Sequence, residues 1–228
     1  MKSVLTHLRK IFDETGKTIL LALEPEPGCL LETTEEFCRF YETMAFDEAL
    51  KKHFGICYDC CHQAVEFEEP VNSLNRLLTA GIPIAKVQVS SGIQVENITA
   101  GVLEGFVESC YLHQTVVRRQ TGELLRYIDL PDALACHDRC AGDEWRCHFH
   151  VPIFLSDESP LPSREGGQNT NVGTTQKFLT TILPLLPKDI LLEVETYTWD
   201  VLPLELRCGT VTDSIISEIR WLKEALHA

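Results

Sequence analysis

The feature that most constrains this chain is a short apolar run, residues 55–58, that ends in the pattern Asp59-x-x-His62. A carboxylate and an imidazole therefore stand where a buried strand passes into a loop. Reactive groups of parallel barrels lie at the carboxyl ends of strands, and carboxylates with imidazoles bind divalent metals. Three further strand-like runs end in the same residue types, at Glu24-Pro25-Glu26, His148-Phe149-His150 and Glu193-Val194-Glu195. The sequence thus predicts a metal centre at the mouth of a parallel barrel.

The order of apolar patterns along the chain is that of an α/β protein. Helical spacing predicts helices at residues 3–14, 33–52, 70–81, 174–186 and 212–226, and continuous apolar runs predict strands at 18–23, 55–59, 82–89 and 190–195. The inner side of the last helix is expected to carry Ile215, Ile216, Ile219, Leu222 and Leu226. These strand–helix units are about half of a closed (β/α)8 TIM barrel. We therefore expect a single, partial-barrel domain over residues 1–228.

Residues 93–172 break this rhythm and form an insertion before the last strand. Residues 111–119 and 124–128 flank Thr121-Gly122 and predict a hairpin, and residues 145–154 resemble another strand. Pro160, Pro162, Gly166 and Gly167 indicate a loop. We interpret the whole insertion as an elaborated loop at the active face of the barrel, since loops of this length are usually functional.

Glu24, Asp59 and Glu195 are each the last polar residue of an apolar strand. With His62 or His150 they would suit Mg, Mn, Co or Zn. Simpler roles stay open: Glu24 could face water at the strand end, and Asp59 could cap the next helix with His62 as its partner. His148 and His150, two residues apart, share one strand face.

Several other residues have two readings each. His113, near Arg118 and Arg119, could orient a carboxylate or phosphate or lie on a solvated hairpin. Trp145 and Trp199 could line an apolar pocket or belong to the core. Cys136, His137 and Cys140, with Cys147 and His148 nearby, could hold structural zinc, or the cysteines could be free thiols.

The net charge of −14 repels phosphate backbones and argues against nucleic-acid binding. No apolar run approaches the roughly 20 residues that span a membrane, and the first ten residues lack the apolar core of a signal peptide. We expect a cytoplasmic protein.

Taken together, five motifs resemble the EboE metabolite traffic proteins, which belong to the xylose isomerase-like TIM-barrel superfamily. The motifs are residues 21–29, Asp59-x-x-His62 with Glu66-Phe67-Glu68, Tyr111-Leu112-His113-Gln114, residues 145–152 and residues 192–200. The resemblance covers nearly the whole chain and begins at about the fourth helix of the barrel, so it implies the C-terminal half of that fold. Half a barrel exposes sheet edges, and this favours pairing with another chain, either a second copy or another Ebo-operon protein.

The resemblance implies that Glu24, Asp59 and Glu195 are metal ligands. It also implies that Glu24, Glu195 and His62 act in catalysis, with His62 contacting substrate. Sugar epimerases of the superfamily place a further histidine on the third of these strands, where this sequence has Gln88. Either His148 or His150 swings in as a replacement, with His150 the preferred fourth ligand, or the metal site is altered. Glu26, His113 and Trp199 are the further residues expected at the substrate.

The function implied is that of a metal-binding, sugar isomerase- or epimerase-like protein acting on a small metabolite in secondary-metabolite processing or trafficking. Two alternatives stay open. One is a non-catalytic trafficking module with a degenerate site, which Gln88 favours. The other is a metal-dependent hydrolase.

Overall fold

The computed structural model describes residues 1–96, 98, 101–136, 142–156 and 172–227. Its centre is a four-stranded parallel sheet in the order β1-β2-β3-β9. The strands are β1 (Leu21–Leu23), β2 (Phe54–Asp59), β3 (Ile84–Val89) and β9 (Leu192–Val194). The four predicted parallel strands are confirmed, in their chain order. The sheet stays open, with β1 and β9 at its edges, so the described residues contain a mixed α/β fold and no closed barrel.

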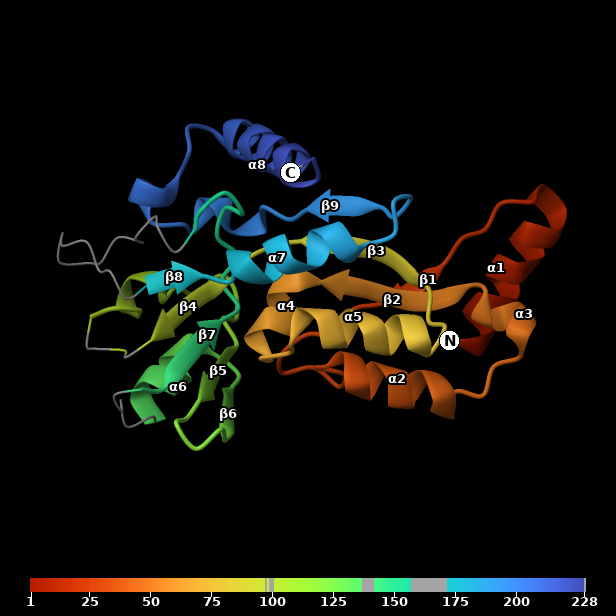
Figure 1. The fold of residues 1–228 in the computed structure, drawn as a ribbon, viewed down its shortest axis with the longest axis horizontal. Helices are drawn as coiled ribbons and strands as arrows, with labels where there is room; N and C mark the ends of the chain where they lie inside the picture. The colour runs from red at the N-terminus through yellow and green to blue at the C-terminus, as the bar shows by residue number, and fades with distance from the viewer. Residues whose placement is uncertain (97, 99–100, 137–141, 157–171, 228) are drawn as a thin grey trace.

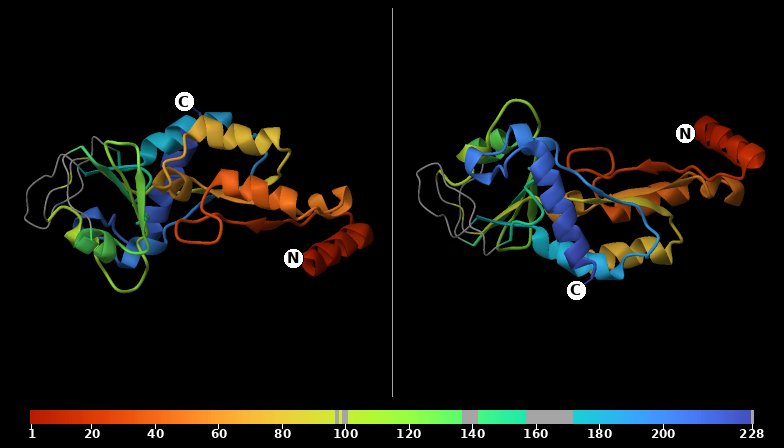
Figure 2. Two further views of the ribbon diagram at one scale, coloured as in Figure 1. Left: turned by 90° about the horizontal axis from the view of Figure 1, so that it is seen from below. Right: turned by 90° about the horizontal axis from the view of Figure 1, so that it is seen from above.

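Helices cover one face of the parallel sheet (Figure 1). They are α2 (Thr34–Thr43), α4 (Cys60–Val65), α5 (Pro70–Thr79) and α7 (Gln176–Ile182). Figure 2, left, shows α5 and α7 on the same side of the strands. Between them and the sheet lies an apolar core that includes Phe37, Phe54, Ile56, Tyr58, Leu74, Val87 and Leu179. Alternate residues of a strand point to opposite faces of the sheet. Phe54, Ile56 and Tyr58 of β2 therefore all point to the helix-covered face, where this core lies.

The other face of the sheet is polar. Residues at paired positions of neighbouring parallel strands point the same way, and the register pairs Cys57 with Lys86, Asp59 with Gln88, and Gln88 with Glu193. Parallel sheets are ordinarily apolar on both faces. A polar face that ends in acidic residues therefore indicates a functional site on this side of the sheet.

The interpretation of the whole insertion at 93–172 as an elaborated loop was wrong, because the described residues within it form most of a second sheet. Its strands are antiparallel, in the order β6-β5-β7-β4-β8, and it lies at the carboxyl ends of the parallel strands (Figure 1). The strands are β4 (Ile93–Glu96), β5 (Thr115–Arg118), β6 (Leu124–Tyr127), β7 (Glu144–Cys147) and β8 (Val172–Thr174), with η1 (Glu104–Phe106) and α6 (Leu130–Cys136) between them. The predicted hairpin is confirmed as β5–β6. A separate apolar core around Trp145, Leu103 and Phe149 explains why the segment folds: its short strands bury alternate side chains.

Three smaller expectations need correction. The helix predicted over residues 33–52 divides into α2 and α3 (Glu48–Lys51), because Ala45 takes a positive φ of 44° and Asp47 caps a new helix. The run at 18–23 forms only the half-buried edge strand β1. The strand-like run at 145–154 is a strand only as far as Cys147.

The helices at the two ends of the chain differ in how well they were predicted. α1 (Lys2–Thr15) ends as expected at Gly16, whose φ is 71°. On α8 (Val211–Ala225) the predicted inner side is confirmed for Leu222, which is buried, and wrong for Ile215, Ile216, Ile219 and Leu226, which are exposed. Ser214 and Glu218 are buried in their place. None of the helices in the described part of the chain is long and apolar enough to cross a membrane.

Gly92 allows the two sheets to meet. It lies between β3 and β4, and a Cβ atom there would stand 2.8 Å from the Cys147 carbonyl oxygen and 2.8 Å from the Cys61 Sγ. The same glycine exchanges hydrogen bonds with Thr175: its amide donates to the Thr175 Oγ1 (2.8 Å), and the Thr175 amide donates to its carbonyl (3.0 Å). Only the absence of a side chain lets α4 and β7 approach this closely.

We predict that Gly92→Ala lowers the free energy of unfolding by about 1–3 kcal/mol, the usual result of overpacking a close contact. Chemical denaturation measures it. Gly105→Ala is the matched control, because a Cβ atom there meets nothing within 4 Å. Equal stability of the two variants would contradict the close approach.

Candidate metal centre

Asp59 lies at the centre of the polar cluster and is fully buried. It ends β2 and caps α4, accepting the His62 amide at 2.7 Å, so the capping role foreseen as an alternative is confirmed. The Ser90 hydroxyl, just beyond β3, contacts both carboxylate oxygens at 2.9 and 3.0 Å. Burial raises the pKa of Asp59 to about 7 despite these hydrogen bonds. The hydrogen bonds thus fix the position of the carboxylate, but they do not offset the effect of burial on its pKa.

Two more carboxylates join Asp59. Glu24, after β1, Glu195, after β9, and Asp59 each offer an oxygen within 4.8 Å of the others. Burial, with Asp59 next in effect, raises the pKa of Glu195 to about 7 and also raises the pKa of Glu24. The Glu195 Oε2 atom is buried without a hydrogen-bond partner. Such a set of close carboxylates is what a divalent cation neutralises.

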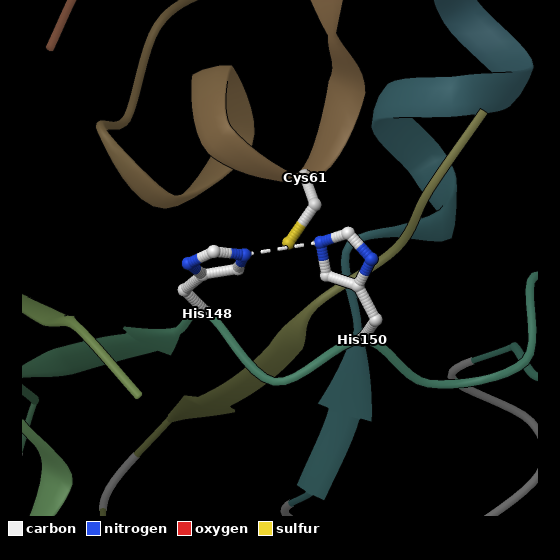
Figure 3. Close-up of side chains that lie close together, drawn as sticks. All are labelled: Cys61, His148 and His150. Atoms are coloured by element: carbon white, nitrogen blue, oxygen red, sulfur yellow. Dashed lines mark hydrogen bonds between the residues drawn. The ribbon is translucent and has the colours of Figure 1, made fainter. Parts of the chain in front are cut away.

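Three imidazoles lie beside the carboxylates. The Nε2 atom of His148 is 3.0 Å from that of His62 and 3.1 Å from that of His150. His62 is on α4, whereas His148 and His150 follow β7, so the second sheet carries two of the rings to the first. Figure 3 shows His148 and His150 directed at each other with Cys61 beside them. Donor atoms of Cys61, His148 and His150, and likewise of Asp59, His62 and His150, lie within 4.8 Å of one another.

Burial keeps these rings neutral. It lowers the pKa of His62, in spite of the nearby Glu24, Glu26 and Glu195. It lowers the pKa of His148 well below the ordinary value and that of His150 to about 3, and the neighbouring imidazoles add to both effects. Neutral imidazole is the form that binds metals.

Hydrogen bonds from outside the cluster orient two of the rings. The Nδ1 atom of His62 donates to the Pro25 carbonyl at 3.0 Å. The Nδ1 atom of His148 donates to the Gln114 Oε1 at 2.7 Å, while the Gln114 amide donates to Glu26 at 3.0 Å. Ligating histidines typically make such contacts through the ring nitrogen that does not bind the metal.

The cluster opens into a cavity of about 540 Å³. The cavity is lined by acids and imidazoles, namely Glu24, Glu26, His62, His148 and Glu195, and by Cys110, Tyr111, Leu112, Gln114 and Tyr197. The Tyr111 and Tyr197 rings meet edge to face with centroids 4.9 Å apart. The cavity lining therefore combines acidic and imidazole groups with a pair of aromatic rings.

The structure brings most of the predicted residues together: Glu24, Glu26, Asp59, His62, His148, His150 and Glu195. Gln88 lies next to Asp59 across the β2–β3 pairing, and its Oε1 atom is buried without a hydrogen-bond partner. The donor set therefore fits a divalent metal. The roles of the individual residues stay predictions.

Other candidates lie elsewhere. His113 is buried behind the site, with its Nδ1 atom 3.0 Å from the His148 carbonyl and its Nε2 atom 2.8 Å from Glu108. Arg118 pairs with Glu144. Trp199 packs on the second core and Trp145 is part of it. Residues 137–140 of the suggested zinc motif and Pro160, Pro162, Gly166 and Gly167 are outside the described residues, and Cys147 is a free thiol.

Sequence reasoning missed the residues that support the site. Ser90, Gln114 and the Pro25 carbonyl act only through hydrogen bonds to the candidate ligands. Gln114 stands next to His113 in a motif already singled out, and Ser90 follows the end of a strand. The position of Ser90 after a strand was a signal available in the sequence. That position alone does not distinguish a residue that hydrogen-bonds a candidate ligand from an ordinary loop residue.

No family model matches the chain, and no curated protein or solved structure matches it either.

We predict a pH signature of Asp59 in protein kept metal-free by a chelator. The folded-state pKa of Asp59 is raised to about 7, so the stability contributed by its protonated form is present at low pH and lost as pH rises through neutrality. From pH 5 to 7 the unfolding free energy of wild type should therefore fall, relative to Asp59→Asn, by up to about 1.4 kcal/mol per pH unit. Urea unfolding measures this, and parallel pH profiles of the two proteins would refute it.

Proposed function

We propose that this chain binds a divalent metal and performs sugar isomerase- or epimerase-like chemistry on a small hydroxylated metabolite in the cytoplasm. One observation carries the proposal: Glu24, Asp59 and Glu195 converge at the carboxyl ends of parallel strands, beside neutral imidazoles and above an open cavity. The open sheet, with helices on one face, supports a partial barrel of the xylose isomerase-like kind. The motifs shared with EboE metabolite traffic proteins support a role in secondary-metabolite processing or trafficking.

Glu24, Asp59 and Glu195 would hold the metal, with His150 as the nearest imidazole ligand and Gln88 or His148 as alternates. When bound, the metal supplies Lewis acidity that polarises substrate oxygens. Glu195, with a pKa near 7, and Glu24 can exchange a proton with substrate carbon or oxygen near neutral pH. His62 and Glu26 face the cavity and can accept or donate hydrogen bonds to hydroxyl groups.

The charge of the cavity indicates the kind of substrate. Among the described residues that line it, carboxylates are present and Lys and Arg are absent. Phosphate recognition generally uses Arg, Lys or a helix N-terminus. We therefore favour an uncharged polyol or sugar over a phosphorylated one, with Tyr111, Leu112 and Tyr197 contacting an apolar part of it.

A metal-dependent hydrolase is the second candidate, because the imidazole group beside the carboxylates is typical of hydrolytic metal centres. The net charge of −14 and the carboxylates that line the cavity disfavour a DNA substrate.

We predict that protein loaded with Mn²⁺ or Co²⁺ exchanges a carbon-bound proton of one or more unphosphorylated ketoses with D2O, as followed by proton NMR. Glu195→Gln should slow the exchange at least about 100-fold, the usual effect of removing a general acid–base group. The matched control is Glu193→Gln, because Glu193 lies on β9, two residues before Glu195, but is exposed and paired with Lys86 at 2.6 Å.

Two results would count against the proposal. If elemental analysis finds no stoichiometric divalent metal and chelator leaves stability unchanged, the metal centre is disproved. If the metal binds but no ketose exchanges while a metabolite still binds, the chain is a non-catalytic trafficking module.

A further inference from the structure

We infer that a second cavity, separate from the candidate metal centre, binds a small oxyanion, either phosphate or an organic carboxylate, through Arg118, Arg146 and Lys177. The cavity has a volume of about 440 Å³ and is lined by the second sheet, by α7 and by the residues that follow α4 (Figure 1). It shares no lining residue with the cavity at the metal centre. The inference therefore stands independently of the proposed function and adds a ligand site to it.

One face of the second sheet is polar and forms a wall of this cavity. The register pairs Gln94 of β4 with Arg146 of β7. It also pairs Glu144 of β7 with Glu96 of β4 and with Arg118 of β5. Paired residues of neighbouring strands share a face, and the alternate residues of these strands face the second apolar core. The strand pairing itself therefore gathers charged groups along one side of the cavity.

Two guanidinium groups stand close together in this wall. The central carbon atoms of Arg118 and Arg146 lie 4.5 and 4.2 Å from the centroid of the Phe67 ring. The two cations share one carboxylate, because the Nε atom of Arg146 donates to one oxygen of Glu144 at 2.8 Å and Arg118 pairs with the other. Arg146 also donates from Nη1 to the Ala64 carbonyl at 2.6 Å. A guanidinium has five N–H groups, so both arginines retain donors that no described residue occupies.

The backbone at Phe67 is strained to hold the ring in this place. The amides of Phe67 and Glu68 donate to the Ala64 and Gln63 carbonyls, both at 3.0 Å, and this is the Schellman motif that ends α4. Glycine is usual at the first of these positions, because φ is positive there, and Phe67 takes a φ of 58°. A bulky residue in this conformation persists only where its surroundings hold it. The strained ring contacts both guanidinium groups and so fixes two cations at the cavity.

The charge of Arg146 is only partly offset by its neighbours. Burial lowers the pKa of Arg146, and Arg118 adds to this effect, in spite of the opposite effects of Glu144 and Glu96. A bound anion would favour the charged form of the buried guanidinium. Lys177 of α7 lines the same cavity, is exposed and makes no salt bridge with any described residue. The cavity therefore offers two fixed guanidinium groups and one mobile ammonium group to a ligand.

Most acids of the cavity are engaged elsewhere. Glu68 pairs with Arg76 at 2.6 Å, and Glu69 caps α5 by accepting the Asn72 amide at 2.8 Å. The exposed Glu96, at the end of β4, is the remaining acid, so the expected ligand is small and carries few charges. Guanidinium groups bind the oxygens of carboxylates and phosphates in pairs, and lysine adds a point charge. The shared chemistry of the expected ligands is therefore that of a small oxyanion.

Isothermal titration calorimetry of the full chain with sodium phosphate and, separately, sodium succinate tests the site. The protein is dialysed free of metal, and sodium chloride holds the ionic strength constant. At least one of the two anions should bind, and it should raise the midpoint of thermal unfolding, because it binds the folded chain only. Arg118→Gln should weaken binding about 10- to 100-fold, the effect of losing a charge-assisted hydrogen bond, and Lys177→Gln about 2- to 5-fold. Both side chains are exposed, so both variants should fold.

Two matched controls have the same charge and are also exposed. Arg39 of α2 pairs with Glu35 at 3.2 Å, and Lys223 lies on α8. Arg39→Gln and Lys223→Gln should bind the anion as wild type does. Binding of phosphate alone or of succinate alone supports the site and identifies its kind of oxyanion.

Three results would overturn the inference. The first is a dissociation constant weaker than about 10 mM for both anions. The second is an equal loss of affinity in the control variants, which would indicate general electrostatic attraction. The third comes from glycine, a zwitterion without net charge, as an additional probe: if it binds as tightly as succinate, the cavity does not select an anion.

Discussion

The burial of one carboxylate, that of Asp59, is the constraint on which the arrangement of the site depends. A fully buried carboxylate is tolerated only when hydrogen bonds or a cation compensate for the lost hydration. Asp59 obtains these hydrogen bonds from the first turn of α4 and from Ser90 after β3. The same bonds fix His62 three residues later and hold the ends of β2 and β3 together. The buried Asp59 carboxylate, which is unfavourable by itself, thereby determines the position of His62 and of the ends of β2 and β3.

The second sheet supplies the histidines that lie beside the acids of the parallel sheet. One face of the parallel sheet is covered by helices, and its polar face ends in acids that need a counterpart. β7 and the residues after it bring His148 and His150 to this edge, while Gln114, just before β5, orients the first of them. The contact is possible because Gly92 lets Cys61 and Cys147 approach. The insertion is therefore part of the site and more than a loop beside it.

The sequence was sufficient for the parallel strands and for the acids that follow them, because both depend on local patterns. Continuous apolar runs that end in Pro, Gly or acid identified β2 and β3, and Asp59 followed from its position. The meeting of His62 with His148 could not be predicted, since the two are 86 residues apart and their contact depends on how two sheets dock. The second sheet was not predicted as a sheet because its strands are only three or four residues long. Strands this short show no clear alternation of apolar and polar residues.

The orientation of α8 shows why a correct periodicity can give the wrong buried face. The isoleucine stripe predicted an apolar inner side, yet the helix buries Ser214 and Glu218 instead. Glu218 accepts the Thr196 hydroxyl at 2.9 Å and the Ile153 amide at 3.2 Å. Thr196 is next to Glu195, and Ile153 lies three residues after His150. The helix thus binds both ligand-bearing loops through one buried carboxylate, and this polar contact, together with Leu222, outweighs the burial of the isoleucine stripe. Its orientation follows from these contacts with Thr196 and Ile153, which the hydrophobic pattern of the helix alone could not reveal.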